Sequence, residues 1–126
     1  MGKYYNYRSR LEREVFEKLD ELADVVVQFD TEKVIIPYFY KGAQLNYVPD
    51  VILKTSSGNV YILEVKYTRD IKAKKNKEKW EAARDFATAY GATFKVITEK
   101  DIANLREILT NKAFLTEEER RRAGRG

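Results

Sequence analysis

Residues 50–66, which read DVILKTSSGNVYILEVK, decide the fold of this chain. Two apolar runs, residues 51–53 and 60–63, flank a short polar turn of Ser, Ser, Gly and Asn. Apolar runs on both sides of such a turn predict a β-hairpin with antiparallel arms. Folding the arms back on the turn brings Asp50, at the start of the first arm, level with Glu64-Val65-Lys66 at the end of the second.

Two carboxylates and an ammonium group at one strand end are costly to bring together unless a cation or a substrate compensates for them. Glu64 and Lys66 point to the same face of their strand, and Ile62 precedes them on that face. The tripeptide alone is weak evidence, because a second acid-X-Lys run, Asp70-Ile71-Lys72, occurs in the lysine-rich stretch that follows. Position separates the two runs, since only Glu64 and Lys66 follow an apolar strand.

These residue types suit metal-assisted hydrolysis of a phosphodiester bond. Asp50 and Glu64 are the predicted metal ligands, and the Val65 carbonyl is a further candidate ligand. Oxygen ligands favour Mg²⁺, with Mn²⁺ as a substitute. Lys66 is the predicted catalytic lysine, which orients the attacking water and neutralises charge in the transition state. The alternative interpretation makes Asp50 a turn residue after Pro49, and Glu64 and Lys66 an ordinary solvated strand end.

The composition restricts the chemistry available to the chain. The 126 residues contain no cysteine and no histidine, which excludes disulfide scaffolds, thiol nucleophiles, zinc fingers and histidine acid–base catalysis. A hydrophobic content of 44% fits one globular domain at residues 1–126, and a net charge of +4 permits a nucleic-acid partner. No apolar run approaches the ~20 residues that span a bilayer, and no signal region is visible, so we expect a cytoplasmic protein without a membrane partner.

Apolar periodicity predicts an α/β fold in which a mixed sheet of about five strands is flanked by helices. Helices are expected at residues 9–23, 77–90 and 101–109. Strands are expected at residues 25–29, 33–40, 45–53, 60–65 and 93–97. The crossover helix before the last strand predicts that this strand lies parallel to residues 60–65. Residues 116–126 are expected to form a short surface helix that frays.

A third acid is expected from the first helix. Glu12 is the better candidate, because it shares a helix face with Val15 and Leu19, whereas Glu14 lies on the outward face. We predict that Glu12 is an auxiliary catalytic carboxylate and metal ligand. The alternative is a capping box, Ser9-Arg10-Leu11-Glu12, in which the Glu12 side chain only reaches back to the Ser9 amide.

Positive charge is concentrated in residues 66–85, where eight cationic side chains stand against four acidic ones. This local excess of +4 adjoins the predicted site, and we therefore predict a DNA-binding surface with salt-sensitive phosphate contacts. Its predicted nucleic-acid-binding residues are Arg69, Lys72, Lys74, Lys75, Lys77 and Lys79. The alternative is a solvated lysine-rich loop and helix start.

Both ends of the chain carry further candidates for nucleic-acid contacts. An aromatic and basic start would stack on nucleic acid or, alternatively, cover a sheet edge, through Tyr4, Tyr5, Tyr7 and Arg8. Near the other end, arginines 120–122 and Arg125 would add phosphate contacts, although neighbouring glutamates largely cancel their charge.

Glu12, Pro49-Asp50 and Glu64-Val65-Lys66, in this order, resemble the motif set of the PD-(D/E)XK nuclease superfamily. Further stretches resemble the TnsA-type transposon endonucleases, namely Ser9-Arg10-Leu11-Glu12, Gln28 before Ile35-Ile36-Pro37-Tyr38, Tyr47-Val48-Pro49-Asp50, and residues 94–101. The resemblance implies a restriction-endonuclease-like fold, Mg²⁺-dependent cleavage of DNA strands in recombination or transposition, and partner proteins that choose the target. Gln28 is a candidate neighbour of the site.

Two alternatives stay open beside a TnsA-like endonuclease. Archaeal and phage Holliday-junction resolvases share the order of helix glutamate, aspartate and Glu-X-Lys, and the 126 residues hold no counterpart of the second domain through which TnsA-type enzymes contact partners. A catalytically silent DNA-binding module with a nuclease fold is the alternative from another class. A sheet edge near residues 38–40 would support a homodimer.

Overall fold

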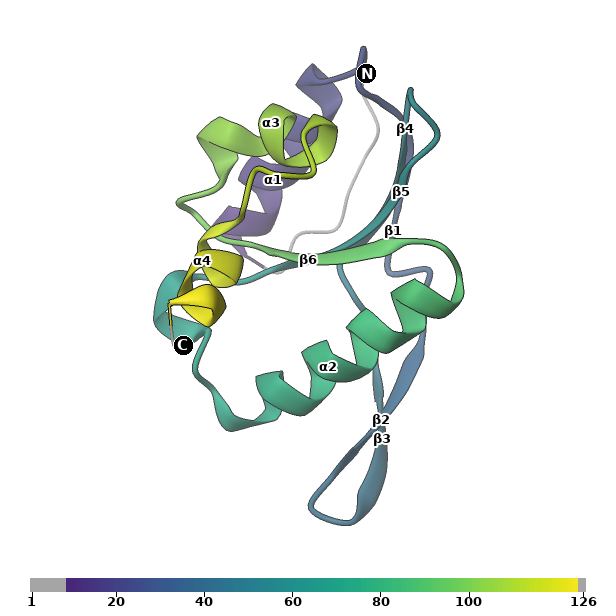
Figure 1. Ribbon diagram of the computed structural model, residues 1–126, viewed down its shortest axis with the longest axis vertical. Helices are drawn as coiled ribbons and strands as arrows, with labels where there is room; N and C mark the ends of the chain where they lie inside the picture. Colours follow the sequence, from purple (N-terminus) through teal and green to yellow (C-terminus); the bar gives the residue numbers. More distant parts are fainter. Residues whose placement is uncertain (1–8, 125–126) are drawn as a thin grey trace.

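The computed structural model describes residues 9–124 and arranges them as a sheet with helices on both faces (Figure 1). The helices are α1 (Arg10–Glu21), α2 (Lys74–Ala89), α3 (Leu105–Thr110) and α4 (Glu117–Ala123). The strands are β1 (Val26–Thr31), β2 (Ile36–Tyr40), β3 (Ala43–Tyr47), β4 (Val51–Thr55), β5 (Val60–Val65) and β6 (Thr93–Ile97). The chain therefore has the predicted α/β fold. In this described part of the chain, no helix is long and apolar enough to cross a membrane.

The main sheet has four strands in the order β1-β4-β5-β6. β4 pairs antiparallel with β1 and β5, and β6 lies parallel to β5 after the α2 crossover, as predicted. In the β4–β5 register Val51 lies opposite Leu63, so Asp50 comes beside Glu64 at the end of the hairpin. The hairpin turn contains Gly58 at a φ of 91°, a left-handed conformation that favours glycine.

The strand arrangement differs from the single sheet of about five strands that the sequence predicts. β2 and β3 form a separate two-stranded hairpin, so six strands are divided between two sheets. The expected strand at residues 45–53 is interrupted at residues 48–50, because Pro49 has no amide hydrogen for a ladder bond. This interruption separates β3 from β4 and leaves the buried Asp50 in the gap between them.

The residues of β5 alternate between two cores on opposite faces of the sheet. Tyr61, Leu63 and Val65 pack into the core formed with α1 and α3, whereas Ile62 packs into the core formed with α2 and the β2–β3 hairpin. Figure 1 shows α1 and α3 on one side of the sheet and α2 on the other. Since side chains alternate along a strand, Glu64 faces the α2 side together with Ile62.

Helix α2 begins at Lys74, three residues before the predicted start at residue 77. Its buried residues are Asn76, Trp80, Ala83 and Ala87. The Asn76 side chain donates hydrogen bonds to the carbonyls of Asp70 and Ile71 at 2.9 and 3.3 Å, which ties the preceding 3-10 turn to the helix. The helix ends before Gly91, whose φ is 70°. Lys74 and Lys75, which the sequence places before the helix, therefore belong to the first turn of α2.

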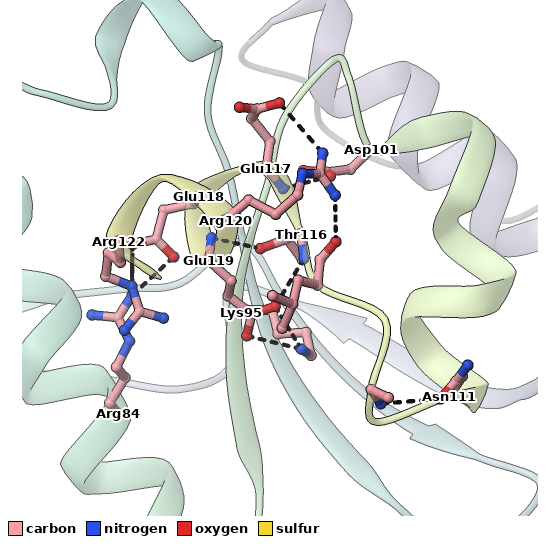
Figure 2. A network of polar contacts seen from close by, with 12 residues as sticks. Arg84, Lys95, Asp101, Asn111, Thr116, Glu117, Glu118, Glu119, Arg120 and Arg122 are labelled. Carbon is pink, nitrogen blue, oxygen red and sulfur yellow. Dashed lines mark hydrogen bonds and ion pairs between the residues drawn. The ribbon is translucent and has the colours of Figure 1, made fainter. Parts of the chain in front are cut away.

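Helix α4 is anchored, in contrast to the frayed surface helix expected at residues 116–126. Thr116 and Glu119 form a capping box at its start. The Lys95 ammonium on β6 donates to both carboxylate oxygens of Glu119 at 3.0 and 2.9 Å, and the Lys95 side chain is only 6% exposed (Figure 2). Asp101 accepts a hydrogen bond from the Glu117 amide at 2.9 Å. These long-range polar contacts hold α4 against the edge strand β6.

Removing the partner of Lys95 should destabilise the fold. We expect Glu119→Ala to lower the free energy of unfolding by about 3 kcal/mol, because it leaves a buried ammonium group uncompensated and removes half of the capping box. Urea denaturation measures this change. Arg13→Ala is the control, since it breaks an exposed pair with Glu17 on α1 and should cost less than about 0.5 kcal/mol. Equal losses in the two variants would contradict this role for Lys95 and Glu119.

Candidate active site

A cavity of about 600 Å³ opens where β5 ends, and the start of α1 and the first turns of α2 contribute to its wall. It gathers all the residues predicted for catalysis and metal binding, which are Glu12, Asp50, Glu64, Val65 and Lys66. Aromatic and basic side chains also line it, among them Tyr47, Tyr67, Lys75 and Lys79. Elements that are distant in the sequence meet here because the β4–β5 register places the two strand ends together.

Asp50 is 4% exposed and occupies the gap between β3 and β4. Its Oδ2 accepts a hydrogen bond from the Val65 amide at 2.7 Å, which fixes the carboxylate against the end of β5. Burial and the nearby Glu64 carboxylate raise the pKa of Asp50 to about 6, while hydrogen bonds with the Val65 amide and the Glu12 side chain oppose this rise. Burial and the second carboxylate therefore make the ionised form of Asp50 less stable than that of an aspartate in water.

Glu64 and Lys66 extend from the end of β5 as an acid and a base on neighbouring positions of one face. Glu64 is 5% exposed, and its Oε2 lies 3.8 Å from the Lys66 ammonium nitrogen. The Lys66 amide donates to the Ile97 carbonyl at 3.0 Å, so the end of β6 holds the Lys66 backbone in place. The Lys66 side chain is half-buried, and its ammonium is accessible to a ligand in the cavity.

Glu12 caps helix α1 through its backbone amide, while its side chain lies at the carboxylate cluster. The Ser9 hydroxyl accepts a hydrogen bond from the Glu12 amide at 3.1 Å, which is one half of a capping box. The Glu12 side chain is buried and lines the cavity together with Asp50 and Glu64. By contrast, Glu14 is exposed and lies 3.8 Å from Arg10. The structure thus brings Glu12, and not Glu14, to the carboxylate cluster.

The donor atoms of the cavity fit a hard divalent cation. Asp50 and Glu64 offer carboxylate oxygens, and Val65 lines the same cavity, so its carbonyl stays the predicted further ligand. Within residues 9–124, no group of three or more acidic side chains is arranged to hold a metal ion. Mg²⁺ commonly binds through one or two carboxylates and keeps waters or substrate phosphates as its other ligands. The pair therefore fits a site that the substrate completes.

Sequence reasoning missed Tyr47, which lines the cavity, and Trp80, which belongs to the same core cluster as Tyr47. The Tyr47 hydroxyl and the Trp80 indole nitrogen are buried, and neither has a hydrogen-bond partner among the described residues. Burial and the Glu64 carboxylate raise the pKa of Tyr47 above its ordinary value. The Lys79 ammonium nitrogen lies 5.1 Å from the centre of the Tyr47 ring. The signal available in the sequence was the position of Tyr47, just before Pro49-Asp50.

The predicted DNA-binding residues separate into three groups. Lys75 and Lys79 line the active-site cavity, where burial lowers the pKa of Lys79. The Arg69 guanidinium lies 4.3 Å from the centre of the Tyr67 ring, next to the same cavity. The remaining three line a second cavity, and they are Lys72, Lys74 and Lys77. One cluster in the sequence thus becomes more than one surface in the structure.

Other candidates lie away from the cavity or outside the described residues. Gln28 is exposed on β1 opposite Lys54 and does not line the cavity. Tyr38 packs against α2, while Phe39 is 68% exposed on the other face of the hairpin, and a homodimer through this edge stays a prediction. Arginines 120–122 form ion pairs with glutamates of α4. The candidates that lie outside the described residues are Tyr4, Tyr5, Tyr7, Arg8 and Arg125.

Comparison with known proteins identifies the family of this chain. A family model described as the TnsA-like endonuclease N-terminal domain matches residues 23–99, which contain Asp50, Glu64 and Lys66. The head completion nuclease of Enterobacteria phage T4 is 29% identical over an alignment 127 residues long, which covers 82% of this chain and 84% of that protein. The segment that matches the family model makes up more than half of the 126 residues. The chain therefore belongs to the TnsA-like endonuclease N-terminal family.

Proposed function

We propose that this protein is a metal-dependent endonuclease that hydrolyses phosphodiester bonds in DNA. The observation that carries this function is the meeting of Asp50, Glu64 and Lys66 at one cavity. Membership of the TnsA-like family supports endonuclease chemistry, and the relative from phage T4 is named as a nuclease. Lys75 and Lys79 beside the carboxylates support a substrate that carries phosphates.

Asp50 and Glu64 would hold Mg²⁺ or Mn²⁺ directly, with the Val65 carbonyl as an auxiliary ligand. Glu12 would be an auxiliary carboxylate outside this direct set. When bound, the cation would supply Lewis-acid activation of the scissile phosphate and of water. Asp50 has to be ionised for this role, and the 2.7 Å hydrogen bond from the Val65 amide stabilises its ionised form. Glu12 lines the same cavity as Asp50, and its negative charge would strengthen the attraction of the site for the cation.

The lysines would act on the phosphate and on the water. Lys66 is near enough to Glu64 to be held in place, and its ammonium would orient the attacking water and stabilise the charge that develops on the phosphate oxygens. Lys79, packed over the Tyr47 ring, and the exposed Lys75 would bind the phosphates that flank the scissile bond.

A catalytically silent DNA-binding module is the competing function. In such a module, Asp50 and Glu64 would repel the DNA phosphates and would gain nothing in return. The raised pKa of Asp50 reflects the cost of keeping both carboxylates buried at one place. Cation binding offsets this cost, which favours the endonuclease over the silent module.

Cleavage of plasmid DNA tests the proposed function directly. We expect the wild type to cleave supercoiled plasmid with Mg²⁺ or Mn²⁺ and not with EDTA, as measured by gel electrophoresis. Lys66→Ala and Asp50→Asn should each lower the rate by about 10²-fold or more, because both groups act on the transition state. Lys100→Ala, at an exposed position that lines neither cavity, is the control. Plasmid that the wild type binds but never cuts would favour the silent module.

Glu12→Gln separates the catalytic role of this residue from capping. Glutamine keeps the backbone amide that donates to the Ser9 hydroxyl, so the free energy of unfolding should change by less than about 0.5 kcal/mol. The cleavage rate should fall at least about tenfold, because the glutamine amide no longer supplies negative charge beside Asp50. The control is Glu14→Gln on the exposed face of α1, which should keep the rate. Equal cleavage rates for Glu12→Gln and Glu14→Gln would show that Glu12 acts only in capping the helix.

The raised pKa of Asp50 makes the stability of the metal-free protein depend on pH. The folded-state pKa of about 6 exceeds the unfolded value of about 3.9, so the folded state holds a proton that the unfolded state has already released. Stability should therefore fall as the pH rises from about 4 to about 6. The Asp50→Asn variant avoids this loss, and its free energy of unfolding should exceed that of the wild type by about 2–3 kcal/mol at pH 7.5 in EDTA.

Denaturation of both proteins at pH 4 and pH 7.5 measures this difference. It should be close to zero at pH 4, and Mg²⁺ should reduce it at pH 7.5 by stabilising the wild type alone. A difference that does not change with pH would contradict the assigned environment of Asp50.

A further inference from the structure

A second cavity, of about 920 Å³, lies between α2 and α4, and we call it the α2–α4 groove. It shares no lining residue with the active-site cavity. Its cationic lining residues are Lys72, Lys74, Lys77, Arg84, Arg121 and Arg122. Its acidic lining residues are Glu78, Glu81 and Glu118. The groove thus carries an excess of positive charge on a side of α2 that the active site does not use.

The α2 wall of the groove carries lysines that are available to a ligand. Lys72, Lys74 and Lys77 are exposed, and none forms an ion pair with another residue in the range 9–124. Lys75 and Lys79 are four residues apart and therefore share a different helix face, the one that lines the active-site cavity. The two sets of lysines therefore lie on different sides of the start of α2, with Lys72 in the turn just before the helix.

The α4 wall is built around one buried carboxylate. Glu118 is 4% exposed and accepts hydrogen bonds from Arg84 at 3.0 and 2.9 Å and from Arg122 at 2.7 Å. Figure 2 shows both guanidinium groups reaching the same carboxylate. Two cations against one anion leave this wall positive, while Arg121 is paired with Glu117 at 3.1 Å. The arginines are held by these bonds and form a preorganised surface.

The outward ridge of α2 forms the rim of the α2–α4 groove that faces the active-site side, and beyond Lys74 in the first turn it is acidic. Glu78, Glu81 and Asp85 follow one another at intervals of three and four residues, and they lie opposite the buried stripe that contains Trp80. Carboxylates on this ridge repel phosphates, so a single duplex would not rest across α2 with one backbone on each side. The basic surfaces on the two sides of the ridge are therefore suited to separate segments of DNA.

We propose that the α2–α4 groove binds the sugar–phosphate backbone of a second DNA segment while the active-site cavity holds the first, so that the preferred substrate is branched DNA. This rests on the proposed function, since DNA is taken as the polymer at the active site. The lysines and arginines of the groove complement phosphates in charge. From residue 74 to residue 84 the helix spans about 15 Å, which corresponds to about four phosphates of one DNA strand.

The test compares the affinities of the protein for a four-way junction and for a linear duplex with the same arm sequence. Fluorescence anisotropy in EDTA with the Asp50→Asn protein measures binding without cleavage. The groove variant is Lys72→Gln/Lys74→Gln/Lys77→Gln. The matched control, Lys33→Gln/Lys100→Gln/Lys112→Gln, removes the same charge from exposed lysines that line neither cavity.

The groove variant should lower the ratio of junction affinity to duplex affinity by about tenfold or more. The slope of log affinity against log salt for the junction should become shallower by about two to three, at about 0.9 for each lost phosphate contact. The control should lower both affinities together and keep the ratio. Circular dichroism verifies that both triple variants are folded.

Two results would overturn the second-segment proposal. Equal losses of junction and duplex affinity in the groove variant would place all the lysines on one duplex, and no loss at all would remove the groove from DNA binding. Failure of the proposed function looks different. A wild-type protein that binds both DNAs but cleaves neither with Mg²⁺ or Mn²⁺ would overturn the endonuclease, while the affinity ratio would still decide the role of the groove.

Discussion

The antiparallel register of β4 and β5, in which Val51 lies opposite Leu63, is the constraint on which both the fold and the site depend. A slip of one residue would exchange the faces of the whole strand and would move Leu63 out of the α1 core. The same slip would carry Glu64 away from Asp50. Because the apolar residues of β5 are buried on both faces, packing holds the register, and the register in turn places the carboxylates.

Burying Asp50 and Glu64 lowers the stability of the fold and, in return, places two carboxylates at the cavity. Asp50 and Glu64 are each about 95% buried, and their proximity opposes ionisation of Asp50. The Val65 amide and the Lys66 ammonium offset part of that cost, but they leave the carboxylate oxygens directed at a cavity. The unpartnered hydroxyl of Tyr47 lies in the same region. Polar groups that remain unsatisfied in an otherwise well-packed chain are typical of a site that is completed by its ligands.

The parts of the fold that the sequence predicts are those governed by local pattern. The hairpin at residues 50–66, the parallel β6 and the inward face of Glu12 each follow from periodicity and a turn. The separate β2–β3 hairpin does not follow from local pattern. A proline can either bend a strand or end it, and the packing of the hairpin against α2 determines that the strand ends here. The anchoring of α4 is equally hidden, since Lys95 and Glu119 are 24 residues apart and look like solvated charges in the sequence. Predicting which lysines line which cavity requires the correct start of α2, and local sequence signals place that start three residues too late.

Helix α2 connects the two basic surfaces through its buried stripe. Trp80 lines the α2–α4 groove and belongs to the same core cluster as Tyr47, which lines the active-site cavity with Glu64. Asn76 fixes the turn before the helix to the same rigid unit. A backbone bound in the groove would therefore sit at a fixed distance from the scissile bond, because one packed helix separates them. That fixed spacing would let the protein select DNA by the angle between two segments, which requires no contact with the bases.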